Sequence, residues 1–156
     1  MLHPAIAHFA VSLPIITFIL GLAYIYKPSE LMSKLSSRFM LVATLFMIAA
    51  YFSGKEDGGE AYIFLTSEGQ ELLKQHKDFA LYLVIGMIVA TLIKLFGCMK
   101  KLFIAEVAAI VLIAILSAGV LYQGNMGGEI TYTHGANVKD HSDGIDCLKD
   151  PEFYLE

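Results

Sequence analysis

The fold is decided by the stretch LFIAEVAAIVLIAILSAGVLY, which covers residues 102–122 and contains one charged residue, Glu106. A helix needs about 20 predominantly apolar residues to cross the ~30 Å hydrocarbon core of a bilayer. Three further apolar runs occupy residues 4–26, 39–52 and 79–97. The short second run reaches spanning length if its helix begins at Glu30, after the start signal Pro28-Ser29. The sequence therefore predicts an all-α protein, a four-helix transmembrane bundle.

Composition supports this class and excludes others. Of the 156 residues, 56% are hydrophobic and 17% are charged, against about 45–50% and about 25% in an ordinary soluble domain. The 11 Lys and Arg residues are outnumbered by 15 Asp and Glu residues, so nothing favours nucleic-acid binding. Two cysteines cannot form a disulfide framework. No basic segment precedes the first apolar run, which we interpret as a retained span rather than a signal peptide.

Basic residues near the spans predict the orientation. They gather in the first and third connections, as Lys27, Lys34, Arg38, Lys94, Lys100 and Lys101. The positive-inside rule places these connections in the cytoplasm, and both termini and residues 54–78 on the outer side. We expect two parts: a bundle with outer His/Gly loops at residues 1–138, and an acidic outer tail at residues 139–156. Glu106 is expected to extend toward the basic interface without a catalytic role.

All five histidines fall on the predicted outer side: His3, His8, His76, His134 and His141. His8 lies about one turn inside the first helix, because Pro4 suits the first helical position. The capping-box pattern at residues 67–70 begins the third helix and places His76 just above the outer hydrocarbon boundary. His8 and His76 therefore reach similar heights on two helices of the same direction.

This pair predicts a metal or haem site. Neutral imidazole is the commonest side-chain metal ligand, and haem iron accepts two axial imidazoles. We interpret His8 and His76 as ligands of a haem b. His3 and His134 are a second ligand pair or donors to haem propionates, so that one or two haems are expected. A purely interfacial role for His8 stays open, and His141 is expected to be simply solvated.

Glycines mark further candidate positions. Gly86 lies on the face of the third helix that carries His76, where it allows close approach of either a helix or a planar ligand. Glycine clusters at residues 53–59 and 123–128 predict loops. The second loop would bend the chain over the outer mouth of the bundle and bring Tyr132 and His134 there.

The motifs resemble a known family. The segments HPAIAHF at residues 3–9 and GGEITYTHGANV at residues 127–138, with Gly54 and His76 between them, resemble the bacterial membrane family named domain of unknown function 2231. The likeness spans roughly residues 1–138, and Ala10 replaces the last proline of the family pattern His-Pro-x-x-x-His-Phe-Pro. Some relatives carry a Rieske iron–sulfur domain after the His-Gly segment. The resemblance implies membrane redox chemistry in a bacterial inner membrane, whose outer side is the periplasm. It gives His3, His8, His76 and His134 as the shared histidines.

Three classes of function stay open. The first is a b-type cytochrome that passes electrons near the periplasmic face, from a quinol to an external redox protein or iron–sulfur partner. Acidic side chains near that face could take up quinol protons or simply be solvated. The second is a non-haem protein that binds copper or zinc. The third is a structural subunit of a larger membrane complex in the bilayer.

Thiol labelling tests the predicted topology. Cys98 is predicted at the cytoplasmic end and Cys147 in the outer tail, so the bilayer prevents a disulfide between them within one chain. An impermeant thiol reagent added to intact cells should label Cys147 and leave Cys98 unlabelled, unless Cys147 bridges two chains of a homodimer. Labelling of Cys98 instead would invert the topology.

Overall fold

Four long helices make up the described part of the chain. A computed structural model describes residues 3–136, with helices α1 (His3–Tyr26), α2 (Glu30–Ala61), α3 (Ser67–Lys100) and α4 (Phe103–Tyr132) and a single 3-10 turn, η1 (Tyr62–Phe64). Each of the four is long and apolar enough to cross a membrane. This confirms the all-α four-helix prediction. The acidic tail, with His141 and Cys147, lies outside the described residues.

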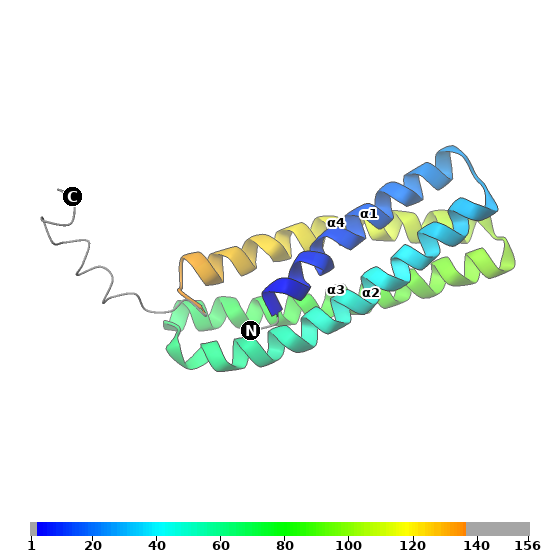
Figure 1. Ribbon diagram of the computed structural model, residues 1–156. Helices are drawn as coiled ribbons and strands as arrows, with labels where there is room; N and C mark the ends of the chain where they lie inside the picture. The colour runs from blue at the N-terminus through cyan, green and yellow to red at the C-terminus, as the bar shows by residue number, and fades with distance from the viewer. Residues whose placement is uncertain (1–2, 137–156) are drawn as a thin grey trace, which may run out of the picture.

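The helices form a ring around a common axis. Helix α1 packs mainly against α2 and α4, and α3 packs against the same two, so α1 and α3 lie diagonally opposite each other. The α1–α2 and α3–α4 connections meet at one end of the bundle, which we call the lysine end because Lys27, Lys34, Lys100 and Lys101 lie there (Figure 1). Residues His3 and His76 lie toward the opposite, histidine end. Helix α1 is the shortest, with 24 residues against 30 in α4 and 34 in α3. The other helices therefore continue past its start (Figure 1).

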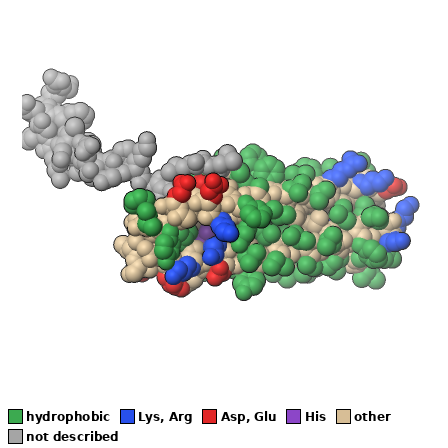
Figure 2. Space-filling model, turned by 90° about the horizontal axis from the view of Figure 1, so that it is seen from below, with side chains coloured by type: hydrophobic (Ala, Val, Ile, Leu, Met, Phe, Trp, Pro, Cys, Tyr) green, Lys and Arg blue, Asp and Glu red, His purple; other side chains and the backbone are tan. Residues whose placement is uncertain are grey.

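The surface has the pattern of a membrane protein. On the face seen in Figure 2, hydrophobic side chains form a belt between two charged ends, and a histidine is visible among the charges of one end. Large apolar side chains such as Ile19, Leu92 and Ile104 are exposed on the surface of the helices. In lipid each backbone polar group must be satisfied inside the protein, which continuous helices achieve.

Local signals explain two helix starts. The Ser29 hydroxyl accepts a hydrogen bond from the backbone N–H of Met32 at 3.2 Å, which confirms the predicted start of α2. Helix α3 begins at Ser67 as expected, but its N-cap is Thr66, whose hydroxyl accepts from Gly69 N–H at 3.3 Å. The expected capping box is not formed, because the Gln70 side chain donates to the carbonyl oxygens of Tyr62 and Leu65 instead.

Both glycine clusters are helical, so the two predicted loops were wrong. Helix α2 runs through residues 53–59, and α4 runs through residues 123–128. A helical glycine costs about 1 kcal/mol relative to alanine in water. Here that cost is offset because the glycines admit side chains of neighbouring helices. Gly54 faces His3, and Gly127 faces His76.

A buried ion pair joins the helices at the lysine end. Lys94 of α3 and Glu106 of α4 are 0% and 2% exposed, and the Lys94 ammonium donates to Glu106 Oε2. The Tyr24 hydroxyl of α1 donates to Oε1 at 2.9 Å, and the Ser33 hydroxyl of α2 donates to Oε2 at 2.6 Å. We call these four residues, one from each helix, the polar quartet.

The polar quartet corrects the prediction that Glu106 extends to the interface. Two features keep it inside: Lys94 supplies a counter-charge there, and Gly97 lets α4 approach α3. A Cβ atom on Gly97 would lie 2.7 Å from Glu106 Cγ. The carboxylate of Glu106 is therefore enclosed between α3 and α4.

Gly86 has the helix-packing role rather than a place at the histidine end. A Cβ atom there would lie 2.7 Å from Cδ2 of Leu116 on α4. Replacing Gly86 by Leu should overpack this contact and destabilise the bundle by about 1–3 kcal/mol. Thermal unfolding in detergent, followed by circular dichroism, measures the loss. Leu116→Ala should restore part of the stability in the double variant, because it vacates the space.

Gly59 offers the matched control, since no atom lies within 4 Å of a Cβ built on it. Gly59→Leu should leave the unfolding temperature nearly unchanged. Equal losses from the two variants would show that the contact with Leu116 does not explain the effect, since Leu has a higher helix propensity than Gly.

Candidate functional site

A small cavity opens at the histidine end. Its volume is about 110 Å³, and it lies where the start of α1 meets the extended parts of α2, α3 and α4. All four helices contribute to its wall, including His3, Gly54, Lys55, Asp57, His76, Lys77, Gly127 and Thr131. We call it the histidine cavity.

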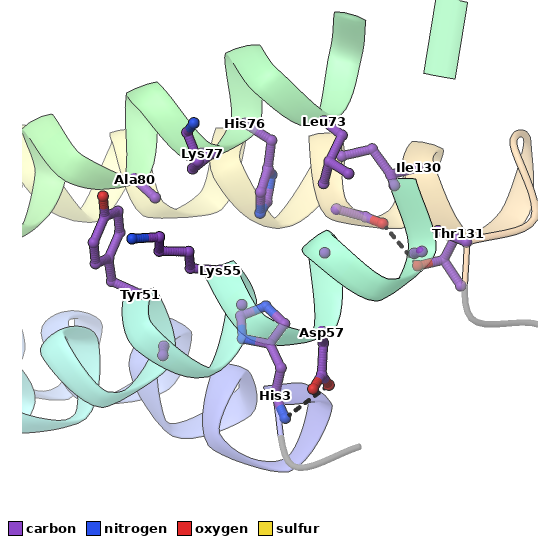
Figure 3. Close-up of a pocket in the computed structure, with 16 residues that line it drawn as sticks. His3, Tyr51, Lys55, Asp57, Leu73, His76, Lys77, Ala80, Ile130 and Thr131 are labelled. Atoms are coloured by element: carbon purple, nitrogen blue, oxygen red, sulfur yellow. Dashed lines mark hydrogen bonds between the residues drawn. The ribbon is translucent and has the colours of Figure 1, made fainter. Parts of the chain in front are cut away.

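The rings of His3 and His76 enter this cavity from two sides (Figure 3). His3 is the first residue of α1; its backbone N–H donates to Asp57 Oδ2 at 3.4 Å, and its Nδ1 lies 3.1 Å from the Ser53 hydroxyl. His76 belongs to α3, and its buried Nδ1 has no hydrogen-bond partner. Because α1 and α3 lie diagonally opposite each other, the two imidazoles face each other across the bundle axis.

Glycines on the other two helices make room for these rings. A Cβ atom on Gly54 of α2 would lie 2.7 Å from His3 Cε1, and one on Gly127 of α4 would lie 3.3 Å from His76 Cε1. Each imidazole therefore packs on bare helix backbone. The signal for this was present in the sequence, but the same glycines were interpreted there as turns.

Charged groups also line the cavity. Lys55 of α2 and Lys77 of α3 contribute to its wall, together with Asp57. Asp57 already accepts from the His3 backbone, and the Lys77 ammonium lies 3.9 Å from Asp78. The two lysines give the cavity wall an excess of positive charge, which suits a ligand with acidic groups.

The other predicted site residues lie elsewhere. His8 is exposed on α1, with its Nδ1 2.6 Å from the carbonyl oxygen of Pro4. His134 packs against Gly69, on which a Cβ atom would lie 3.0 Å from the imidazole, and Tyr132 is 91% exposed. None of the three contributes to the wall of the histidine cavity.

Helix geometry explains why His3, and not His8, joins His76. Five residues separate the two along α1, and at 3.6 residues per turn they point about 140° apart. When His3 faces the bundle axis, His8 faces outward. The role of His8 as a ligand stays a prediction, whereas the structure itself brings His3 and His76 together.

The donor set of the cavity is two imidazoles. Within residues 3–136, no group of three or more His, Cys, Asp or Glu side chains is arranged to hold a metal ion. A metal bound by His3 and His76 would therefore need further ligands that these side chains do not provide.

Fold and site together define a four-helix membrane protein with a two-histidine cavity at one end. The family described as Predicted membrane protein (DUF2231) matches residues 1–140, and the chain belongs to this family. The resemblance drawn from the motifs is thereby confirmed. Neither the curated proteins nor the solved structures include a match to the chain.

The contact between Gly54 and His3 can be tested directly. Gly54→Leu should push the His3 ring out of the cavity, because the added side chain occupies its place. The reactivity of His3 toward diethyl pyrocarbonate, measured by mass spectrometry, should then rise several-fold. Gly59→Leu, on the same helix but facing open space, should leave that reactivity unchanged. Equal His3 reactivity in both variants and in the wild type would contradict the packing described here.

Proposed function

We propose that this membrane protein is a b-type cytochrome in which His3 and His76 hold the haem iron. The observation that carries the proposal is the meeting of two imidazoles from diagonal helices in one cavity. Haem iron accepts imidazole ligands, and His3 and His76 would hold the group between α1 and α3. A haem held in this way supplies one-electron transfer. The residues around the histidine cavity would bind the group, orient it and shield it.

The side chains around the cavity suit such a group. The Nδ1 atom of His3 has the Ser53 hydroxyl beside it, which leaves Nε2 available to a metal. The buried Nδ1 of His76 has no partner in the described chain, and a buried polar atom of this kind is costly unless a ligand or water satisfies it. Lys55 and Lys77 are placed to pair with acidic substituents of a bound macrocycle.

Cavity size sets a requirement on this proposal. A volume of about 110 Å³ is below the roughly 300–1,000 Å³ of sites for larger ligands. Haem entry therefore requires this end of the bundle to widen. His3 occupies the first turn of α1, where backbone N–H groups have no helical partner, so its ring can move without breaking the helix.

The small volume favours a second candidate, a copper or zinc ion bound by the same two histidines. Such an ion needs no widening, and imidazole suits both metals. Further ligands would then come from water or from a partner.

A quinol donor and an external iron–sulfur or other redox acceptor remain part of the first proposal. They depend on the predicted periplasmic position of the histidine end.

Spectra of histidine variants test the proposal. The purified protein, titrated with ferric haem, should develop a Soret band and, after reduction, the sharp α and β bands of a six-coordinate low-spin haem. His3→Ala and His76→Ala should each abolish or strongly alter these bands. His8→Ala and His141→Ala are the matched controls and should preserve them. Loss of the bands in His8→Ala with retention in His3→Ala would return the ligand role to His8.

Metal analysis separates the alternatives. A protein that takes up no haem, but binds one copper or zinc ion lost in both His3→Ala and His76→Ala, would support the second candidate. Binding of neither would leave the third class, a structural subunit of a membrane complex.

A further inference from the structure

The lysine end contains a second cavity, which reaches the polar quartet. Its volume is about 290 Å³, enough for several water molecules at about 30 Å³ each. It lies between the two helix connections of this end and reaches Glu106, Tyr24 and Ser33. The remaining wall is formed by Pro28, Ser29, Glu30, Lys34, Cys98 and Lys101. A buried carboxylate thus borders a polar space at the end of the bundle.

Each charge of the polar quartet has partners besides the opposite charge. The Glu106 carboxylate accepts from the hydroxyls of Tyr24 and Ser33 as well as from Lys94. The Lys94 ammonium donates to the Ser33 carbonyl oxygen at 3.3 Å and lies 4.8 Å from the centre of the Tyr24 ring, a cation–π distance. If Glu106 gains a proton, Lys94 still has a carbonyl and an aromatic face to stabilise its charge. Protonation of Glu106 therefore does not leave the Lys94 charge without partners.

An apolar layer separates this site from the histidine cavity. Met40 of α2, Met87 of α3 and Ile113 of α4 are each 0% exposed and belong to one core cluster. Among these apolar side chains, the buried hydroxyls of Thr44 and Thr91 hydrogen-bond to each other at 2.7 Å. The cavity that reaches Glu106 lies at the lysine end.

We propose that Glu106, with Lys94 as its partner charge, is a proton-binding site that exchanges protons with water at the lysine end. Ionisable side chains at membrane depth are costly and are retained where they act. One proton passes from water in the cavity to a carboxylate oxygen of Glu106, and the net charge of the pair changes from zero to plus one on Lys94. The site is independent of any haem or metal at the opposite end.

The titratable groups that contact Glu106 or line its cavity come from the other three helices and the end of α3. They are Tyr24 on α1, Glu30 and Lys34 on α2, Lys94 and Cys98 on α3, and Lys101 at the C-terminal end of α3. Glu30 and Lys34 form an exposed pair of their own at 2.6 Å, so Lys94 is the charge that controls Glu106. The prediction is a single protonation event assigned to one carboxyl.

Carbodiimide labelling tests the site in the full chain. Dicyclohexylcarbodiimide modifies membrane-embedded carboxyls in their protonated form. Intact protein in membranes should gain one adduct on Glu106 as the pH falls, and Glu106→Gln should lose it. Glu30→Gln, which removes an exposed carboxylate at the same end, is the matched control and should leave the adduct unchanged. Lys94→Met should be modified also at the higher pH values at which the wild type resists, because an unpaired buried carboxylate keeps its proton.

Further measurements keep the proposal falsifiable. If Lys94→Met does not accumulate, Ser33→Ala removes one donor to the carboxylate while keeping the ion pair, and should likewise extend modification to higher pH. In vesicles of known orientation, a water-soluble carbodiimide should modify Glu106 from the lysine side only. Absence of an adduct, together with absence of a protonated carboxyl band in infrared spectra at every pH, would show a permanently ionised pair and overturn the proposal. Modification from the histidine side would overturn its one-sidedness.

Discussion

The ion pair of Lys94 and Glu106 is the constraint on which the rest of the bundle depends. Lipid offers no water to solvate a bare charge, so the two side chains must stay together wherever the helices are placed. The Tyr24 and Ser33 hydroxyls tie the remaining two helices to the same carboxylate. Each residue of a continuous helix advances the chain by 1.5 Å. The alignment of the four helices at the lysine end therefore also determines which residues meet at the other end.

The two ends differ in how completely their polar groups are satisfied. At the lysine end, carboxylate and ammonium each have several partners within the protein. At the histidine end, His76 Nδ1 and Gln123 Oε1 are buried and lack partners, although the Gln123 amide donates to the His76 carbonyl oxygen at 2.8 Å. A saturated network holds a structure in place, whereas an unsaturated one is completed by a ligand. This contrast supports placing a bound group beside His76.

Four glycines of the described helices share one role, which is to admit a neighbouring side chain. Gly54 and Gly127 admit imidazoles, Gly86 admits Leu116, and Gly97 admits Glu106. At Gly86, within the apolar part of α3, the helix stays continuous because its backbone hydrogen bonds cannot be replaced by bonds to water. Close contact between neighbouring helices is what each glycine contributes. The polar quartet and the histidine cavity both depend on it.

The sequence by itself determined the fold class, since four apolar runs of near-spanning length have few other ways to bury their backbone. It also gave the start of α2 at Ser29, a local signal, and His76 as a candidate ligand. Tertiary structure decided the rest. Whether His3 or His8 faces His76 depends on the rotation of α1 about its axis, and whether Glu106 is buried depends on a lysine 12 positions away on another helix. Both are set by contacts between helices, which periodicity within one segment does not contain.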